Sequence, residues 1–309
     1  MEIIKLFNAL PGAVAQGLIW GIMAIGVYIT YKILDIADLT VDGTMCTGGA
    51  VCVMMMLSGH NVVTALAVAT IAGLLAGFVT GVLHTVMGIP AILSGILTQL
   101  GLYSVNLLIL GGKANQAINV DNYDLLVSLR FVKVGNVFQN TIFVVALITV
   151  VMVVIVYCFF GTEIGAALRA TGSNNRMACA QGINITFTKI LGLMLSNGIV
   201  AFSSALYSQY QGFADVNAGR GAIVIGLASV IIAEVLFDRF IHNLAIKLLS
   251  VSVGSIIYFL VIQIVLWLGL DSNYLKLLSA VIVAIFLAVP NLLEKWRIRS
   301  AYSAGGEDE

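Results

Sequence analysis

The chain has 309 residues, of which 60% are hydrophobic and only 10% charged, and its formal net charge is zero. A soluble domain carries about 25% charged residues, so this composition excludes an ordinary soluble fold. The balanced charge leaves no basic footprint for nucleic acid, and the four cysteines lack the spacing of metal ligands.

Long apolar runs follow one another along the chain. Val62–Val82 and Thr141–Phe160 contain no Lys, Arg, Asp or Glu, and each is long enough to cross a bilayer core, which takes about 20 helical residues. Their polarity does not alternate, which excludes a β-barrel. We predict an all-α polytopic membrane protein with a single domain over residues 1–309. About nine spans are expected: Gly12–Leu34, Thr44–Leu57, Val62–Gly88, Ala91–Leu110, Asn140–Phe160, Thr186–Tyr207, Ala222–Phe237, Ala245–Leu270 and Tyr274–Val289.

The segment before the first span reads MEIIKLFNALPG. It has no small-residue cleavage site, and Glu2 accompanies its one lysine, which argues against a cleaved signal. We expect a short interfacial helix here that ends at Pro11, because proline cannot continue the hydrogen bonds of a helix.

A polar stretch, ADLTVDG at 37–43, precedes a short span expected to begin at Thr44. Asp38, Thr40 and Asp42 are candidate residues of a translocation pathway. Two roles are open for them. Asp42 or Thr44 caps the helix by accepting hydrogen bonds from its first N–H groups, or an interrupted helix opens toward a cavity that holds a solute. We expect capping as the main role and expect Asp38 to line the cavity.

A second polar stretch, ADVNAGRG at 214–221, precedes the other short span. Asp215, Asn217 and Arg220 are pathway candidates with the same two roles, and Asp215 and Arg220 are close enough in sequence to form a local ion pair. The two stretches resemble each other, and the expected topology puts them on opposite sides of the membrane. That is the pattern of an inverted repeat with paired interrupted helices.

Polar residues inside the spans are few. Glu234 interrupts an apolar run, and a carboxylate within a membrane span indicates function by default; the alternative is hydration at the cytoplasmic end, beside Asp238 and Arg239. Buried hydrogen bonds between helices account for the amides Gln99, Asn106, Asn197 and Gln263. Glycines spaced four apart predict close helix packing at Gly73, Gly77 and Gly81.

The most informative segment is Gly161–Asn184, GTEIGAALRATGSNNRMACAQGIN, between two apolar spans. It begins as an amphipathic helix, passes through the cap-rich TGSNN at 171–175 and resumes as a second short helix. Lipid offers no hydrogen-bond partners to such a connection, so it must lie on an aqueous side. We interpret residues 161–185 as a docking site for a soluble partner.

Basic residues set the orientation. The tail at 290–309 carries Lys295, Arg297 and Arg299 next to the last span, so it is expected to be cytoplasmic. Counting back along the spans places residues 161–185 inside and residues 111–139, 209–220 and the N-terminus outside. Arg169 and Arg176 agree with this placement, whereas Lys113, Arg130 and Lys133 in the expected outer loop oppose it.

The chain has no Gly-x-x-x-x-Gly-Lys-Ser/Thr loop, so it cannot bind ATP in the P-loop manner. No Ser/His/Asp or His-Glu-x-x-His arrangement indicates an enzyme. We expect no catalytic residue, metal or cofactor in this chain.

The segment at 165–184 resembles bacterial ABC-importer permeases of the branched-chain amino acid/ribose/nucleoside superfamily. The resemblance covers nearly the whole chain, and the ADLTVDG stretch is most similar to the subgroup for aromatic, tryptophan-type amino acid uptake. The positions that match the motif of the family are Gly165, Ala167, Arg169, Ala170, Gly172, Asn174, Ala178, Gly182, Ile183 and Asn184; Asn175 and Arg176 lie among them.

The resemblance implies that residues 161–185 form a coupling helix seated in a groove of a cytoplasmic ATPase. It implies a bacterial plasma-membrane importer of a small organic solute, an amino acid of aromatic type. The implied partners are a second copy of the chain, two ATPase subunits that bind ATP and Mg, and an extracellular solute-binding lipoprotein. The rival class is an ion-coupled secondary transporter or channel without an ATPase, which would use Glu234 and Asp38.

Overall fold

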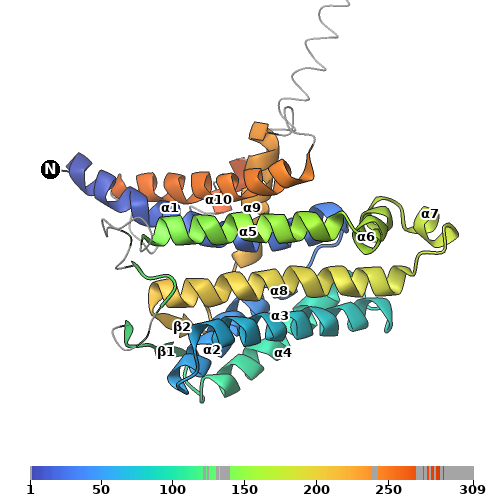
Figure 1. Ribbon diagram of the computed structural model, residues 1–309, viewed down its shortest axis with the longest axis horizontal. Coiled ribbons are helices and arrows are strands. Elements are labelled where there is room, and N and C mark those ends of the chain that lie inside the picture. The colour runs from blue at the N-terminus through green and yellow to red at the C-terminus, as the bar shows by residue number, and fades with distance from the viewer. Residues whose placement is uncertain are drawn as a thin grey trace, which may run out of the picture.

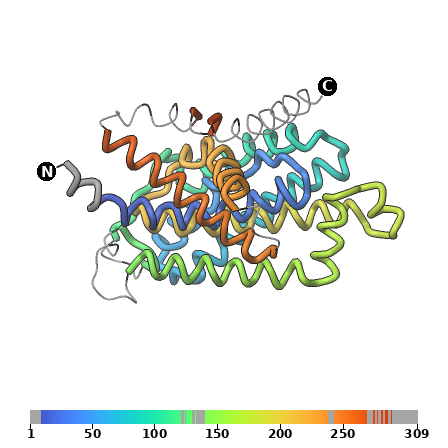
Figure 2. Tube along the Cα trace, turned by 90° about the horizontal axis from the view of Figure 1, so that it is seen from above, coloured from blue at the N-terminus to red at the C-terminus, as the bar shows by residue number. Residues whose placement is uncertain are grey.

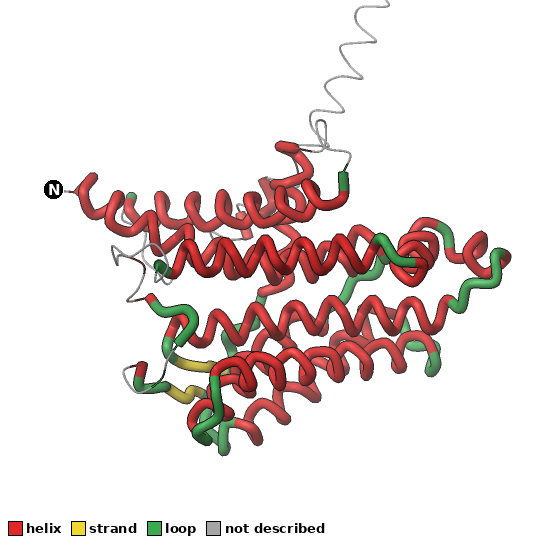
Figure 3. Tube along the Cα trace, viewed as in Figure 1, coloured by secondary structure: helices red, strands yellow, loops and turns green. Residues whose placement is uncertain are grey.

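The computed structural model describes residues 2–120, 123, 125–129, 132, 140–237 and 243–268, with single positions between 274 and 288. Helices dominate this part of the chain, and two short strands lie at one end of it (Figure 3). The elements in chain order are α1 Glu2–Tyr28, the π-helical turn η1 Ile29–Ile33, α2 Thr40–Leu57, α3 Val62–Thr85, α4 Ala91–Ile109, β1 Asn115–Ala117, α5 Thr141–Phe160, α6 Glu163–Ser173, α7 Asn175–Ala180, α8 Ile185–Gln211, β2 Phe213–Asp215, α9 Ala222–Phe237 and α10 Leu244–Trp267.

Seven of these helices are long and apolar enough to cross a membrane, and α9 is a shorter apolar helix. The predicted all-α polytopic membrane fold is therefore confirmed. The expected last span, Tyr274–Val289, lies largely outside the described residues, as do the tail at 290–309 and the loop charges Arg130, Lys133, Asp238 and Arg239.

Most of the long helices run in a common direction and form two groups (Figure 1). Helices α1, α5 and α10 make up the upper group, and α2, α3, α4 and α8 the lower one. Helix α9 passes from the lower group to the upper at a steep angle to the long helices, and the view from above shows it end-on (Figure 2). Strands β1 and β2 pair in antiparallel fashion at the end of the bundle where α2 and α8 finish.

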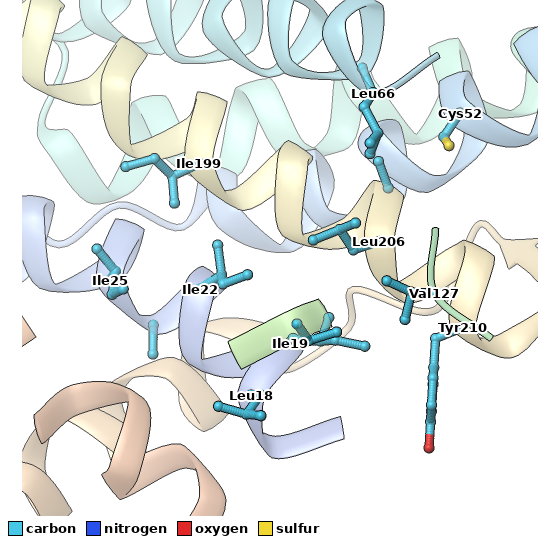
Figure 4. Packing of buried hydrophobic residues seen from close by; sticks show 14 of the residues in the cluster. Leu18, Ile19, Ile22, Ile25, Cys52, Leu66, Val127, Ile199, Leu206 and Tyr210 are labelled. Carbon is cyan, nitrogen blue, oxygen red and sulfur yellow. The ribbon is translucent and has the colours of Figure 1, made fainter. Parts of the chain in front are cut away.

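The core lies mainly between α1 and α8. Ile19, Ile22 and Ile25 repeat at helical spacing on α1 and are fully buried, with Ile199 and Leu206 of α8 in the same cluster (Figure 4). Serine hydroxyls support this contact, because Ser196 Oγ donates to Gly26 O at 2.7 Å and Ser203 Oγ donates to Ile19 O at 2.7 Å. Apolar packing and interhelical hydrogen bonds together hold such helices in lipid.

Helices α3 and α8 pack backbone to backbone, as the glycine spacing predicts. A Cβ atom at Gly73 or Gly77 would overlap the carbonyl oxygen of Asn197 or Leu193, and one at Gly81 would lie 2.9 Å from Ile190 Cα. Only glycine permits this approach, so the stripe on α3 fixes the position of α8.

The outer faces of several helices are exposed and apolar. Only 22% of the apolar windows of α4 and α5 is buried inside the chain. Leu100 and Leu108 on α4 and Leu147 and Ile155 on α5 are more than half exposed. Apolar patches of this extent do not face water in a soluble monomer, so these surfaces are suited to lipid or to another subunit.

Two expected helix boundaries were wrong. Helix α1 continues through Pro11 rather than ending there, since membrane helices tolerate the one backbone hydrogen bond that proline removes. Helix α2 begins at Thr40, not at Thr44. Its first turn is stabilised from outside the helix, by the carboxylate of Asp38, whose Oδ1 accepts from Thr40 N at 2.9 Å.

Candidate functional site

A buried polar network surrounds Asp38, which is 2% exposed. Its Oδ1 accepts from Thr40 N, and its Oδ2 accepts from Asn197 Nδ2 of α8 at 2.7 Å. Thr44 Oγ1 donates to the other end of the same amide, Asn197 Oδ1, at 2.7 Å. Thr40 Oγ1 lies 2.7 Å from Thr80 Oγ1 of α3. The network therefore ties the segment at 34–39 to α2, α3 and α8.

Asp42 joins α2 to α9. Its Oδ2 accepts from Gly221 N and its Oδ1 from Ile223 N, both at 2.9 Å. These backbone groups belong to the start of α9, where the unpaired N–H groups and the helix dipole favour a negative charge. Asp42 also lies in the first turn of α2, so one carboxylate serves the N-terminal ends of two helices.

The two polar stretches therefore meet, and the expectation that they lie on opposite sides of the membrane was wrong. Cys46 Sγ, one turn beyond Asp42, donates to Val216 O at 3.0 Å and accepts from Gly219 N at 3.2 Å. The prediction placed the stretches by counting spans, which assumes that each helix begins at a membrane surface. Here α2 and α9 both begin beside Asp42, within the bundle.

A cavity of about 340 Å³ opens beside this junction. Its wall combines α2, α4 and the segment before α9, and it is lined by Asp42, Gly43, Cys46, Gln99, Leu100, Tyr103, Asn106, Val216 and Arg220. Two of the six pathway candidates, Asp42 and Arg220, thus share one cavity. The expected cavity residue, Asp38, is instead enclosed in the hydrogen-bond network at the start of α2, whereas Asp42 both holds the start of α9 and lines the cavity.

The other candidates hold local structure. Asp215 Oδ1 accepts from Asn217 N at 2.7 Å, which closes the turn after β2, and no ion pair joins Asp215 to Arg220 in the part of the chain that the structure describes. Glu234 is neither isolated in the membrane nor simply hydrated, because its Oε1 lies 2.7 Å from Lys32 Nζ of η1. The pair ties α9 to the end of the first span.

Helices α6 and α7 extend beyond the ends of α5 and α8 in both views of the bundle (Figures 1 and 2). Helices α6, α7 and α8 each begin with a side-chain cap. Thr162 Oγ1 accepts from Gly165 N, Asn174 Oδ1 from Arg176 N and Met177 N, and Asn184 Oδ1 from Phe187 N. Such caps fix short helices that would not form alone in water.

The motif positions divide into two groups. Gly165 and Gly172 allow close backbone contacts, Ala178 is buried, Gly182 has a φ of +80°, and Asn174 and Asn184 are caps. Ala167, Ala170 and Ile183 are half-buried. The exposed side chains that hold no local structure are those of Arg169, Asn175 and Arg176. Met177, which the sequence analysis did not single out, is 55% exposed beside them.

Helix α6 rests on the end of the first span and on α8. A Cβ atom at Gly172 would overlap the carbonyl oxygen of Ile33. Thr171 Oγ1 lies 3.0 Å from Thr188 Oγ1 of α8. Since residues 34–39 run from Ile33 to Asp38, a continuous stretch of packed chain joins α6 to the polar junction.

The model of the family "Branched-chain amino acid transport system / permease component" matches residues 10–290 of this chain. The chain belongs to this permease family. The expected family is thus confirmed over almost the whole permease, including both polar stretches and the α6–α7 segment.

Individual relatives agree. The permease is 39% identical over 292 residues to a tyrosine transport system permease protein of Clostridioides difficile, with 92% of each chain covered. It is 26% identical over 184 residues to the autoinducer 2 import system permease protein LsrC of Yersinia pseudotuberculosis, with 59% of this chain and 50% of the relative covered. In fold it resembles the solved PsaBC from Streptococcus pneumoniae in complex with Fab, with a TM-score of 0.53, 16% identity and coverage of 92% and 95%.

Sequence reasoning missed the α4 wall of the cavity. Gln99 and Asn106 were assigned to helix–helix hydrogen bonds, and Tyr103 was not considered. Their spacing carries a signal, because positions 99, 103 and 106 lie on one face of a helix. Asn197 does form the expected interhelical bonds, and so does Asn106, whose Nδ2 donates to Gly43 O of α2 at 3.4 Å.

Proposed function

We propose that this permease is the membrane subunit of an ATP-binding-cassette importer that moves an amino acid with an aromatic side chain. Two copies form the membrane part, two cytoplasmic ATPase subunits supply the energy, and an extracellular solute-binding lipoprotein delivers the solute. In this arrangement the α6–α7 end of the bundle is cytoplasmic, and the end with β1 and β2 is extracellular.

The α6–α7 segment carries this proposal. It is capped at each helix start and extends from the bundle. It also presents Arg169, Arg176 and the exposed apolar side chain of Met177 to a partner. Interfaces are rich in arginine and methionine. A rigid segment of this kind is suited to a groove on a soluble ATPase.

The contacts of α6 give the mechanism. Movement of the ATPase displaces α6, which presses on Ile33 through Gly172 and on α8 through Thr171. The segment at 34–39 contains Asp38, and α8 carries its hydrogen-bond partner Asn197. Asp38 in turn accepts from Thr40 N at the start of α2. Alternating access requires that the ATPase bind the two states of the permease with different free energies. Because the contacts from α6 to Asp38 are continuous, the position of α6 at one end of the bundle can shift the conformation around Asp38.

The choice of cargo follows the relatives. Among them the tyrosine transport system permease covers 92% of the chain at 39% identity, whereas the autoinducer 2 relatives match a shorter part at lower identity. An ion-coupled transporter is less well supported, because Glu234 is paired with Lys32 and Asp38 is enclosed by hydrogen bonds. Neither carboxylate is free to bind and release an ion in this state.

Reconstitution tests the proposal. The chain, its ATPase and its solute-binding protein are placed in liposomes, and uptake of radiolabelled L-tyrosine is followed with ATP or a non-hydrolysable analogue. We expect uptake only with hydrolysable ATP and all three components. Arg169→Glu should abolish ATP-driven uptake, whereas Arg169→Lys should retain most of it. Uptake by the chain alone, driven by a proton or sodium gradient, would show that the rival class is correct.

A further inference from the structure

The cavity beside Asp42 carries one charge of each sign. The Asp42 carboxylate already accepts from Gly221 N and Ile223 N, and the backbone N–H of Ala222 also interacts with it. Since its two oxygens offer about four lone-pair sites, it can accept one more hydrogen bond. The guanidinium of Arg220 makes no hydrogen bond or ion pair with any described residue. The cavity therefore offers a positive group without a partner and a negative group with remaining acceptor capacity.

Asn106 adds an unsatisfied acceptor to the same wall. The residue is 1% exposed, its Nδ2 donates to Gly43 O at 3.4 Å, and its Oδ1 has no partner among the described residues. Buried polar atoms are normally hydrogen-bonded, and an exception calls for an explanation. A donor group on a bound solute would supply the missing hydrogen bond.

The rest of the lining suits an apolar or aromatic side chain. Leu100 and Tyr103 both line the cavity from α4, and Tyr103 lies on the same helix face as Asn106. The cavity volume of about 340 Å³ falls at the small end of the range for small-molecule sites, about 300–1,000 Å³. This volume matches one compact solute rather than a peptide or a lipid.

We propose that this cavity binds the zwitterionic head of a single α-amino acid. Arg220 binds the carboxylate, while Asp42 and Asn106 Oδ1 accept from the ammonium group, and the side chain lies against Tyr103 and Leu100. This assignment rests on the proposed function and specifies the solute class. A solute that carries both charges pairs with both Arg220 and Asp42. An amine or an acid alone can pair with only one of the two charged groups, so it forfeits one charge-assisted hydrogen bond and binds less tightly.

Arg220 is the most informative residue to change, since its guanidinium makes no hydrogen bond or ion pair with a described residue, whereas Asp42 also holds the start of α9. In the reconstituted importer, Arg220→Ala should lower ATP-driven L-tyrosine uptake at saturating solute-binding protein by roughly 10- to 100-fold, the range for a lost hydrogen bond to a charged group. Arg220→Lys should recover part of it. Lys113→Ala, an exposed cation outside the cavity, is the matched control and should leave uptake unchanged.

A second measurement does not depend on transport. A cysteine is introduced by Leu100→Cys, with the exposed native cysteines Cys158 and Cys179 changed to serine, and alkylation is timed in nanodiscs. L-tyrosine should slow the alkylation, whereas tyramine and 3-(4-hydroxyphenyl)propionate should not. Arg220→Ala should remove the protection.

The outcomes separate this proposal from the proposed function. If no amino acid is taken up with ATP but L-tyrosine still protects Leu100→Cys, the importer assignment fails and the site stands. If uptake is normal in Arg220→Ala, or if tyramine protects as well as L-tyrosine, the site assignment fails alone. Weaker binding of the solute-binding protein to Arg220→Ala, with protection unchanged, would make Arg220 a docking contact and would also overturn the site.

Discussion

At the scale of single residues, two aspartates four positions apart do different work. Asp38 is enclosed and satisfied by Thr40 and Asn197, whereas Asp42 is partly exposed to the cavity and serves the start of α9. The local sequence shows only that each aspartate lies near the start of a helix. The partners that distinguish them, Asn197 for Asp38 and Gly221 and Ile223 for Asp42, lie 159 to 181 positions away. The sequence alone therefore predicts that both carboxylates form polar contacts, but not which one faces the cavity.

The Asp38 network makes a prediction about stability. Asn197→Leu leaves Asp38 Oδ2 and Thr44 Oγ1 buried without their partner. Leaving a buried donor or acceptor unsatisfied costs about 1–3 kcal/mol, and more when the group is charged, so we expect a marked fall in the unfolding midpoint of the purified permease during titration with SDS. Thr70→Val is the control, because among the described residues Thr70 Oγ1 donates to Leu66 O within its own helix and to no other helix. Equal midpoints for the two variants would contradict this role of Asn197.

At the scale of elements, the glycine stripe of α3 predicts a sharp contrast between two glycines. Gly77→Ala places a methyl group against Leu193 O of α8, and Gly101→Ala places one on the open face of α4, where no described residue lies within 4 Å. Overpacking costs about 1–3 kcal/mol, while alanine on an open helix face is neutral or favourable. In the same SDS titration, the unfolding midpoint should therefore fall for Gly77→Ala and stay unchanged for Gly101→Ala. Destabilisation of both variants to the same extent would indicate a general intolerance of substitution.

The contact between α6 and η1 predicts a coupling variant. Gly172→Ala forces α6 away from Ile33, so the chain should still bind the ATPase and the ATPase should still hydrolyse ATP, with uptake per ATP reduced. Ser173→Ala, the exposed neighbour on the same helix, should behave as the wild type. The ratio of tyrosine taken up to phosphate released measures the effect. An unchanged ratio in Gly172→Ala would show that this contact does not transmit movement.

Element boundaries were predictable where the signal is local. The start of α9 at Ala222 follows Gly221, which has a φ of +87°, and the caps of the α6–α7 segment stand directly before their helices. The start of α2 was misplaced because its stabilising carboxylate precedes it by two residues. The junction of α2 with α9 was missed because hydropathy records which residues lie in lipid but not the depth at which a helix begins.

At the scale of the whole molecule, the position of the cavity predicts where a second copy binds. The wall formed by Gln99, Tyr103 and Arg220 is polar and open, while the neighbouring surface of α4 is apolar and only 22% of its window is buried. Charged groups within a membrane face a protein interior or a water-filled space rather than lipid. A second copy placed against α4 would shield the cavity and leave the outer face of α5 to the lipid.

Cysteine cross-linking tests this arrangement in native membranes. Ser104 is exposed on α4, and Val154 is 53% exposed on α5. In a background with Cys158 and Cys179 changed to serine, Ser104→Cys should form a disulfide-linked dimer under mild oxidation, because residues near a two-fold axis approach within the roughly 7 Å that a disulfide requires. Val154→Cys should remain monomeric. Cross-linking through Val154→Cys instead would place the axis at α5 and leave the cavity facing lipid, which would contradict this arrangement of the two copies.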